Sequence, residues 1–99
     1  MAFTLRQLQF FIAAAEAGSV SGAARALSIS QSSVTEAIRA LEDDLGITLF
    51  DRLARGIQIT HKGSAFLRHA RQILADVATA RTAFQEDAAP LPGKLSLGV

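Results

Sequence analysis

The sequence predicts a mainly helical fold in which three helices precede a two-stranded hairpin and one long final helix. Three early segments carry apolar residues at helical spacing, and each follows a serine or threonine that can cap it. Between residues 47 and 59 the apolar period becomes that of a strand, and from residue 66 onward it is again helical. We therefore expect a compact domain over residues 1–59, a long helix over 60–88 and a further segment over 89–99.

Composition disfavours several classes of protein. The chain has no cysteine, so neither a disulfide framework nor a thiolate metal site is expected. His61 and His69 have no nearby partner ligands, whereas zinc normally needs three or four. The apolar run from Phe10 to Ala15 is far too short to span a membrane. No nucleophile with its base, paired carboxylates or glycine-rich phosphate loop is visible. We expect a soluble, cytoplasmic protein that is not an enzyme and holds no metal or cofactor.

The first two helices are predicted by their caps. The first helix should begin after Thr4 and end at Gly18, and Ser19 or Ser21 can cap the second. A turn of only two residues then leads to Ser30, the candidate N-cap of the third helix. Two helices joined by so short a turn cross steeply, as in a helix-turn-helix, although an isolated helical pair shares this pattern.

The third helix separates a buried line from a polar one. Its apolar line is formed by Val34, Ile38, Leu41 and Leu45. Nearly opposite, at 100° per residue, lie Ser32, Glu36, Arg39 and Asp43, and the same outward face is flanked near its start by Ser33 and Thr35. Small polar side chains in the first two turns suit a DNA major groove. The last turn carries Glu42, Asp43 and Asp44, which would repel phosphates, so the helix would enter DNA with its N-terminus leading. An ordinary solvent-exposed face remains the alternative.

A two-stranded hairpin is predicted after the third helix. Ile57 and Ile59 alternate around one polar residue, and Gly56 is available for the turn. Arg52 and Arg55 then lie near the tip, where they could contact phosphates or a narrow minor groove. A plain exposed hairpin explains the strands equally well.

The final helix is predicted to begin after Thr60 and to run for roughly 40 Å, longer than a domain of this size needs. One apolar stripe repeats at intervals of four and three residues, through Phe66, Ala70, Ile73, Val77, Ala80 and Phe84. A three-helix core cannot cover the whole stripe, so we expect a second copy of the chain to cover it and form a homodimer. The alternative is a helix folded back onto its own domain.

Charge is unevenly distributed along the chain. Between Arg52 and Arg71 there are five cationic residues and no acidic one, so the overall charge of +1 leaves −4 for the other residues. Such a distribution would orient a polyanion on one region of the molecule. A solvated helix face accounts for the charges as well.

These residues resemble a known family. The pattern AAxxLxxSQxSVTxxIxxLExxLGxxLFxR, followed by RGIQIT and a TxKG entry to the last helix, is similar to the N-terminal domain of the LysR-type transcriptional regulators. The resemblance covers the chain from about Phe3 to the segment Leu95–Val99. It implies a winged helix-turn-helix and a linker helix that pairs antiparallel in a dimer. It also implies an effector-binding domain, for which residues 89–99 would be a hinge and a truncated start.

The resemblance further implies partners and site residues. The partner would be double-stranded promoter DNA with a pseudo-palindromic, often AT-rich site, bound by a homodimer that forms tetramers in full-length proteins. A small-molecule inducer is expected only for the effector domain. By position, the DNA contacts would come from Ser21, Gln31, Ser32, Ser33, Thr35, Arg52 and Arg55. The outward face of the third helix adds Arg39 to these candidates.

Glu36 departs from the family pattern, because many relatives have arginine at this position. Its carboxylate repels phosphate and cannot donate to guanine, but it could accept a hydrogen bond from a cytosine amino group. We expect either an altered base preference or weaker anchoring to phosphates. Two other classes remain as alternatives to a DNA-binding module, namely a dimerisation module with a structural helix-turn-helix and an enzyme fragment.

Overall fold

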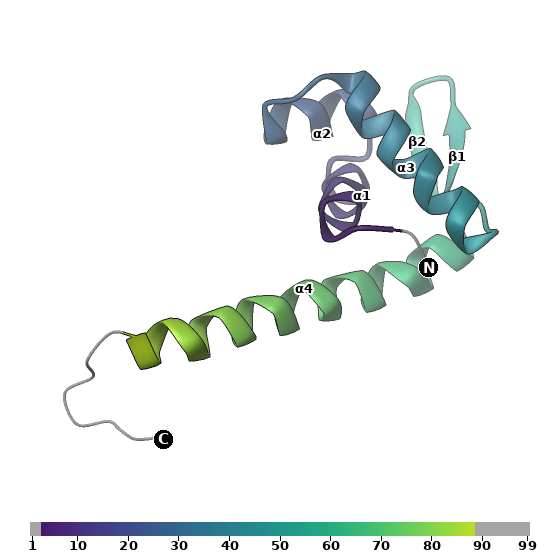
Figure 1. The fold of residues 1–99 in the computed structure, drawn as a ribbon. Coiled ribbons are helices and arrows are strands. Elements are labelled where there is room, and N and C mark those ends of the chain that lie inside the picture. The colour runs from purple at the N-terminus through teal and green to yellow at the C-terminus, as the bar shows by residue number, and fades with distance from the viewer. Residues whose placement is uncertain (1–2, 89–99) are drawn as a thin grey trace.

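A computed structural model describes residues 3–88, with side chains to residue 84, and confirms the predicted fold class. The elements are α1 (Leu5–Ala17), α2 (Val20–Leu27), α3 (Gln31–Leu45), β1 (Phe50–Leu53), β2 (Gly56–Ile59) and α4 (His61–Ala88). Figure 1 shows α1, α2, α3 and the hairpin gathered into one body, from which α4 extends as a long rod. The predicted segment 89–99 lies outside the described residues.

Local hydrogen bonds set the helix boundaries. Thr4 and Gln7 cap α1 reciprocally, since each side chain accepts from the backbone N–H of the other at 3.1 and 2.9 Å. Gly18 ends the helix with a left-handed φ of 72°. The structure selects Ser19, not Ser21, as the cap of α2, because its hydroxyl accepts from Gly22 N at 2.9 Å. Ser30 caps α3 as predicted.

The core lies between α1, α2, α3, the base of the hairpin and the first half of α4. Its fully buried large side chains are Leu8, Phe11, Val34, Leu41 and Leu49. The Phe11 ring contacts the rings of Phe50 and Phe66, with centroids 5.4 and 5.5 Å away. Offset and tilted pairs of this kind add about 0.5–1.5 kcal/mol each to the burial of their area. These contacts attach the hairpin and α4 to the helical body.

The hairpin is antiparallel, with Phe50 opposite Ile59 and Leu53 opposite Gly56, so its turn consists of residues 54–55. Gly56 has a φ of +129° and lies against the α1–α2 turn. A Cβ added there would be 2.9 Å from the Gly18 carbonyl oxygen, and Ile57 N donates to the same oxygen at 3.4 Å. The turn end of the hairpin is therefore held at the start of α2.

A carboxylate and a hydroxyl join the hairpin to the helices. Glu42, on α3, accepts from Leu49 N at 2.8 Å and from Phe50 N at 3.4 Å. Thr60 Oγ1 donates to Thr48 O at 2.5 Å, and it accepts from Gly63 N at 2.9 Å at the start of α4. These bonds satisfy backbone groups that would otherwise lack partners at the strand and helix ends.

The structure corrects one residue of the predicted dimer stripe, Ala70, which lies in the first half of α4. Ala70 has no exposed surface within the single chain, so it has no area left for a partner. Phe66 and Ile73 pack partly against the same core, because α4 crosses α1 here. Farther along, Val77 is half-buried, Ala80 is exposed and Phe84 is 74% exposed. Among the described residues, no helix is long and apolar enough to cross a bilayer.

Candidate nucleic-acid interface

The outward face of α3 is polar, as predicted, but its residues are not equally available. Gln31, Ser32, Glu36 and Arg39 are exposed. Ser33 and Thr35 are half-buried, and the Ser33 hydroxyl lies 2.9 Å from Ser30 Oγ, within the helix cap. The side chains that stand free on this face are therefore those most nearly opposite the buried line, together with Gln31 at the start of the helix.

The far end of α3 has the opposite electrostatic character. Asp43 and Asp44 are exposed in its last turns, whereas Glu42 is half-buried and bound to the start of β1. An anion would be repelled from this end and attracted to the first turn, where the helix dipole is positive. This difference in charge between the two ends of α3 favours the binding of an anion at its N-terminal half.

The start of α2 adds a second outward surface. Ser21 is exposed in the first turn, and Arg25 lies one turn later on the same face, opposite the buried Ala23 and Ala24. The sequence prediction did not include Arg25. The sequence does contain a signal for it, because Arg25 follows Ser21 by four residues and therefore lies on the same face of a helix.

Arg52 and Arg55 lie on the hairpin as predicted. Arg52 is on β1 opposite Ile57, Arg55 is in the turn, and both are exposed. Because Gly56 contacts the α1–α2 turn, Arg55 is held near the start of α2. Two cationic side chains thus flank the helix-turn-helix from an element that is distant in sequence.

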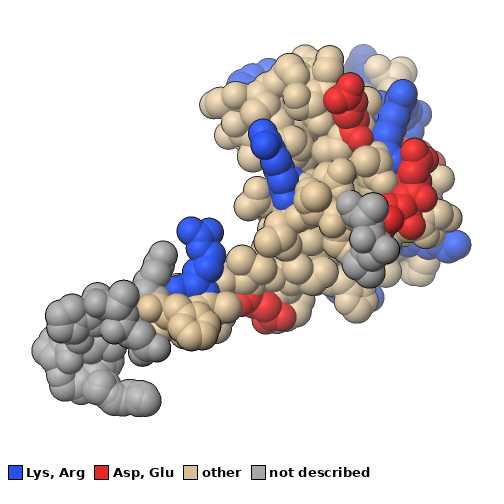
Figure 2. All heavy atoms as spheres, in the orientation of Figure 1, with Lys and Arg blue, Asp and Glu red and all other residues tan. Residues whose placement is uncertain are grey.

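The five cations between Arg52 and Arg71 do not form one patch. Lys62, Arg68 and Arg71 lie on α4, which Figure 1 shows on the other side of the body from the hairpin turn. Arg71 forms an ion pair with Glu16 at 3.3 Å. On the face in Figure 2, the blue side chains are scattered over the body and α4. Of these five cations, Arg52 and Arg55 lie beside the helix-turn-helix, so the charge along the sequence overstated the basic surface.

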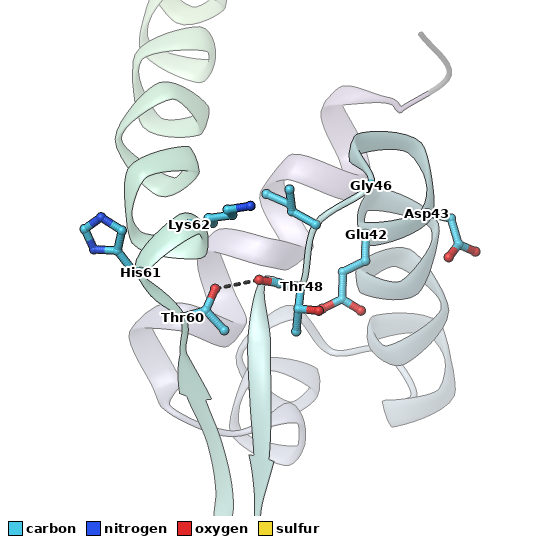
Figure 3. A pocket seen from close by; sticks show the side chains of 8 residues that line it. Glu42, Asp43, Gly46, Thr48, Thr60, His61 and Lys62 are labelled. Atoms are coloured by element: carbon cyan, nitrogen blue, oxygen red, sulfur yellow. Dashed lines mark hydrogen bonds between the residues drawn. The ribbon is translucent and has the colours of Figure 1, made fainter.

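A hollow of about 770 Å³ lies between the end of α3 and the start of α4. It is lined by Glu42, Asp43, Gly46, Ile47, Thr48, Thr60, His61 and Lys62. In Figure 3 the His61 ring and the Asp43 carboxylate point away from its centre, and the Thr60 hydroxyl bonds to Thr48. Since Glu42 is also bound to β1, the charged groups do not converge on one point. Within the described residues, no cluster of potential metal ligands is present.

Comparison with known proteins identifies the family. Residues 5–64 match the bacterial regulatory helix-turn-helix proteins of the lysR family. The chain is 58% identical over 69 residues to the HTH-type transcriptional regulator TfdS of Cupriavidus pinatubonensis (strain JMP 134 / LMG 1197), which is 70% of this chain and 23% of TfdS. The chain is also 45% identical to the HTH-type transcriptional regulator TfdT of the same organism. That match extends over 93 residues, which are 94% of this chain and 41% of TfdT.

Two solved structures of DNA-binding domains in complex with DNA are similar to this fold. The CbnR domain bound to DNA has a TM-score of 0.79 and 44% identity, covering 89% of this chain and 100% of that chain. The BenM domain bound to catB site 1 DNA has a TM-score of 0.85 and 31% identity, covering 90% and 100%. The chain spans about a quarter of the length of TfdS. Because the family match covers residues 5–64 with the fold described above, this chain belongs to the LysR family of bacterial regulatory helix-turn-helix proteins.

Proposed function

We propose that this chain binds double-stranded promoter DNA sequence-specifically, as the DNA-binding domain of a LysR-type transcriptional regulator in the bacterial cytoplasm. The observation that carries the proposal is the similarity to the CbnR and BenM domains, both of which were solved with DNA. Membership of this family of transcriptional regulators also sets the chain apart from enzymes.

In the proposed complex, α3 enters the major groove with its N-terminal half leading. A groove about 12 Å wide admits a helix, and the exposed polar residues of the first two turns would meet base edges there. Ser33 and Thr35 would contribute less than the exposed members of the face, because they are half-buried. The acidic last turns would stay clear of the phosphates.

The hairpin and α2 would hold the backbone on either side of α3. Arg52 and Arg55 would contact phosphates or the minor groove, and Ser21 would meet a phosphate at the start of α2. The exposure of all three side chains supports this assignment. Contacts of this kind fix the position of a protein on DNA without reading its sequence.

A homodimer would present two copies of α3 to a pseudo-palindromic site, about one helical turn apart. Its interface would use the part of the α4 stripe that the core leaves exposed, chiefly Val77, Ala80 and Phe84, with the outer surfaces of Phe66 and Ile73. Burying the 74% exposed Phe84 ring supplies a physical reason for the pairing. We place tetramer formation and response to a small-molecule inducer in the remainder of such a regulator, beyond residues 1–99.

A fluorescence-anisotropy titration tests the proposal. The chain is titrated against a duplex carrying a pseudo-palindrome from the promoter beside its own gene, and against a scrambled duplex, at several salt concentrations. Tighter binding to the first, saturating at two chains per duplex, is expected. Equal and steeply salt-dependent binding to both would reduce the function to backbone attraction. Absence of binding at low salt would favour a protein-interaction module instead.

A further inference from the structure

We propose that Glu36 and Arg39 act together as readers of one C·G base pair in each half-site. Glu36 would accept a hydrogen bond from the cytosine N4 amino group, and Arg39 would donate to guanine O6 and N7. This inference rests on the proposed function, because it requires α3 to lie in the major groove. It predicts a half-site that cannot consist of A·T pairs alone.

The placement of both residues carries the first step. They lie nearly opposite the buried Val34, Ile38 and Leu41, and both are exposed. Glu36 lies in the second turn of α3 and Arg39 at the start of the third. Of the other candidates on this face, Ser32 is short, and Ser33 and Thr35 are half-buried. Glu36 and Arg39 are therefore the long side chains that project most directly from the face that would meet the groove floor.

The second step is that both charged groups are free to bind a ligand. Within the described residues, Glu36 makes no hydrogen bond or ion pair, and Arg39 makes none either. Residues three apart on a helix often pair when their charges are opposite, yet these two do not. The Glu36 carboxylate and the Arg39 guanidinium are therefore not bound to each other or to neighbouring helices in the described part of the chain.

The chemistry of base edges selects the partner of Glu36. A carboxylate only accepts hydrogen bonds, and the donors in the major groove are the amino groups of cytosine and adenine. Adenine places its N7 acceptor beside its amino group, so the second carboxylate oxygen would face a lone pair. Cytosine has only a C–H there. Any base without a donor leaves the carboxylate unsatisfied among phosphates, so Glu36 selects cytosine partly by penalising the alternatives.

Arg39 supplies the complementary half. The guanidinium fork matches O6 and N7 of guanine, which is the Watson–Crick partner of the cytosine. Three residues advance about 4.5 Å along α3, a little more than the roughly 3.4 Å rise of one base pair. The two side chains are therefore close enough along α3 to address the two strands of one base pair.

Selection from a random duplex library tests this reading. The library carries a random core of about 21 base pairs, two helical turns, and is bound by the wild type, Glu36→Gln, Arg39→Ala and Asp43→Asn. Asp43→Asn is the matched control, because it removes the same charge from the same outward line about 10.5 Å farther along α3.

We expect the wild type to enrich a C·G pair at one position of each half-site, with about 5- to 150-fold discrimination against other bases. Glu36→Gln should change that position to adenine, because a glutamine amide matches N6 and N7. Arg39→Ala should lose the guanine preference, and Asp43→Asn should give the wild-type motif.

Retention of cytosine enrichment by Glu36→Gln would overturn the assignment of Glu36. A uniform loss of affinity for all sequences in Arg39→Ala would assign Arg39 to a phosphate and overturn the paired reading. In both cases the wild-type motif still shows that the chain reads DNA. Failure of the wild type to enrich any sequence would instead refute the proposed function itself.

Discussion

Replacing Gly56 with alanine should displace the hairpin, and the effect can be derived from two features of this position. Gly56 has a φ of +129°, and an added Cβ would lie 2.9 Å from the Gly18 carbonyl oxygen. Holding a residue with a side chain in a sparsely populated backbone region costs about 1–3 kcal/mol. In a domain of this size each kcal/mol lowers Tm by roughly 4–8 °C. Thermal unfolding followed by circular dichroism measures this loss.

The same substitution should weaken DNA binding, because relieving the clash with the Gly18 carbonyl separates the hairpin from the α1–α2 turn. Arg52 and Arg55 would then be withdrawn from the phosphates that they are proposed to contact. The slope of log affinity against log salt concentration should become shallower by up to about 1.8, at about 0.9 for each phosphate. Anisotropy titrations of Gly56→Ala at several salt concentrations give this slope.

Gly46→Ala is the matched control. Gly46 also has a positive φ, of +70°, but an added Cβ would meet nothing within 4 Å. We therefore expect a loss of stability without any change in the salt dependence of binding. If Gly56→Ala binds DNA with the wild-type salt slope, the contact with Gly18 does not position the arginines, and the reasoning is refuted.

Three further predictions follow from the interface and the core. Arg52→Ala should reduce the salt slope by about one unit in the same titration, whereas Arg68→Ala on α4 should leave it unchanged; equal effects would place the DNA elsewhere. Glu42→Ala should destabilise the fold by about 1–3 kcal/mol in urea unfolding, because the N–H groups of Leu49 and Phe50 lose their acceptor. An unchanged midpoint would contradict that role. Phe84→Asp should convert a dimer to a monomer in sedimentation equilibrium, and an unchanged mass would remove α4 from the interface.

Much of the fold was predictable because its boundaries are set by local chemistry. Thr4, Ser30, Gly18 and Gly46 act within one helical turn of where they stand in the sequence, so the pattern of caps and apolar residues was sufficient. The hairpin followed from the change of period and from a residue suited to positive φ, Gly56. The outward face of α3 followed from helical geometry alone.

The remaining features depend on how distant segments approach one another. Glu42 was counted among the acidic residues that repel phosphate, but α3 brings it to the first N–H groups of β1. Ala70 was assigned to a dimer, but α4 crosses α1 and buries it within the chain. The basic stretch was divided between the hairpin and α4, because consecutive segments fold to different sides. None of these contacts between distant segments can be predicted from the apolar periodicity or the local charge of the sequence.

The central claim is that the N-terminal half of α3, the start of α2 and the hairpin turn form one DNA-binding surface. Backbone amide chemical shifts, recorded while a duplex carrying the chain's binding site is added, test this claim directly. We predict large shifts at Ser21, Ser32, Glu36 and Arg55, and small ones at His61 and Lys62 beside the hollow. Large shifts confined to the hollow or to α4, with α3 unaffected, would contradict it.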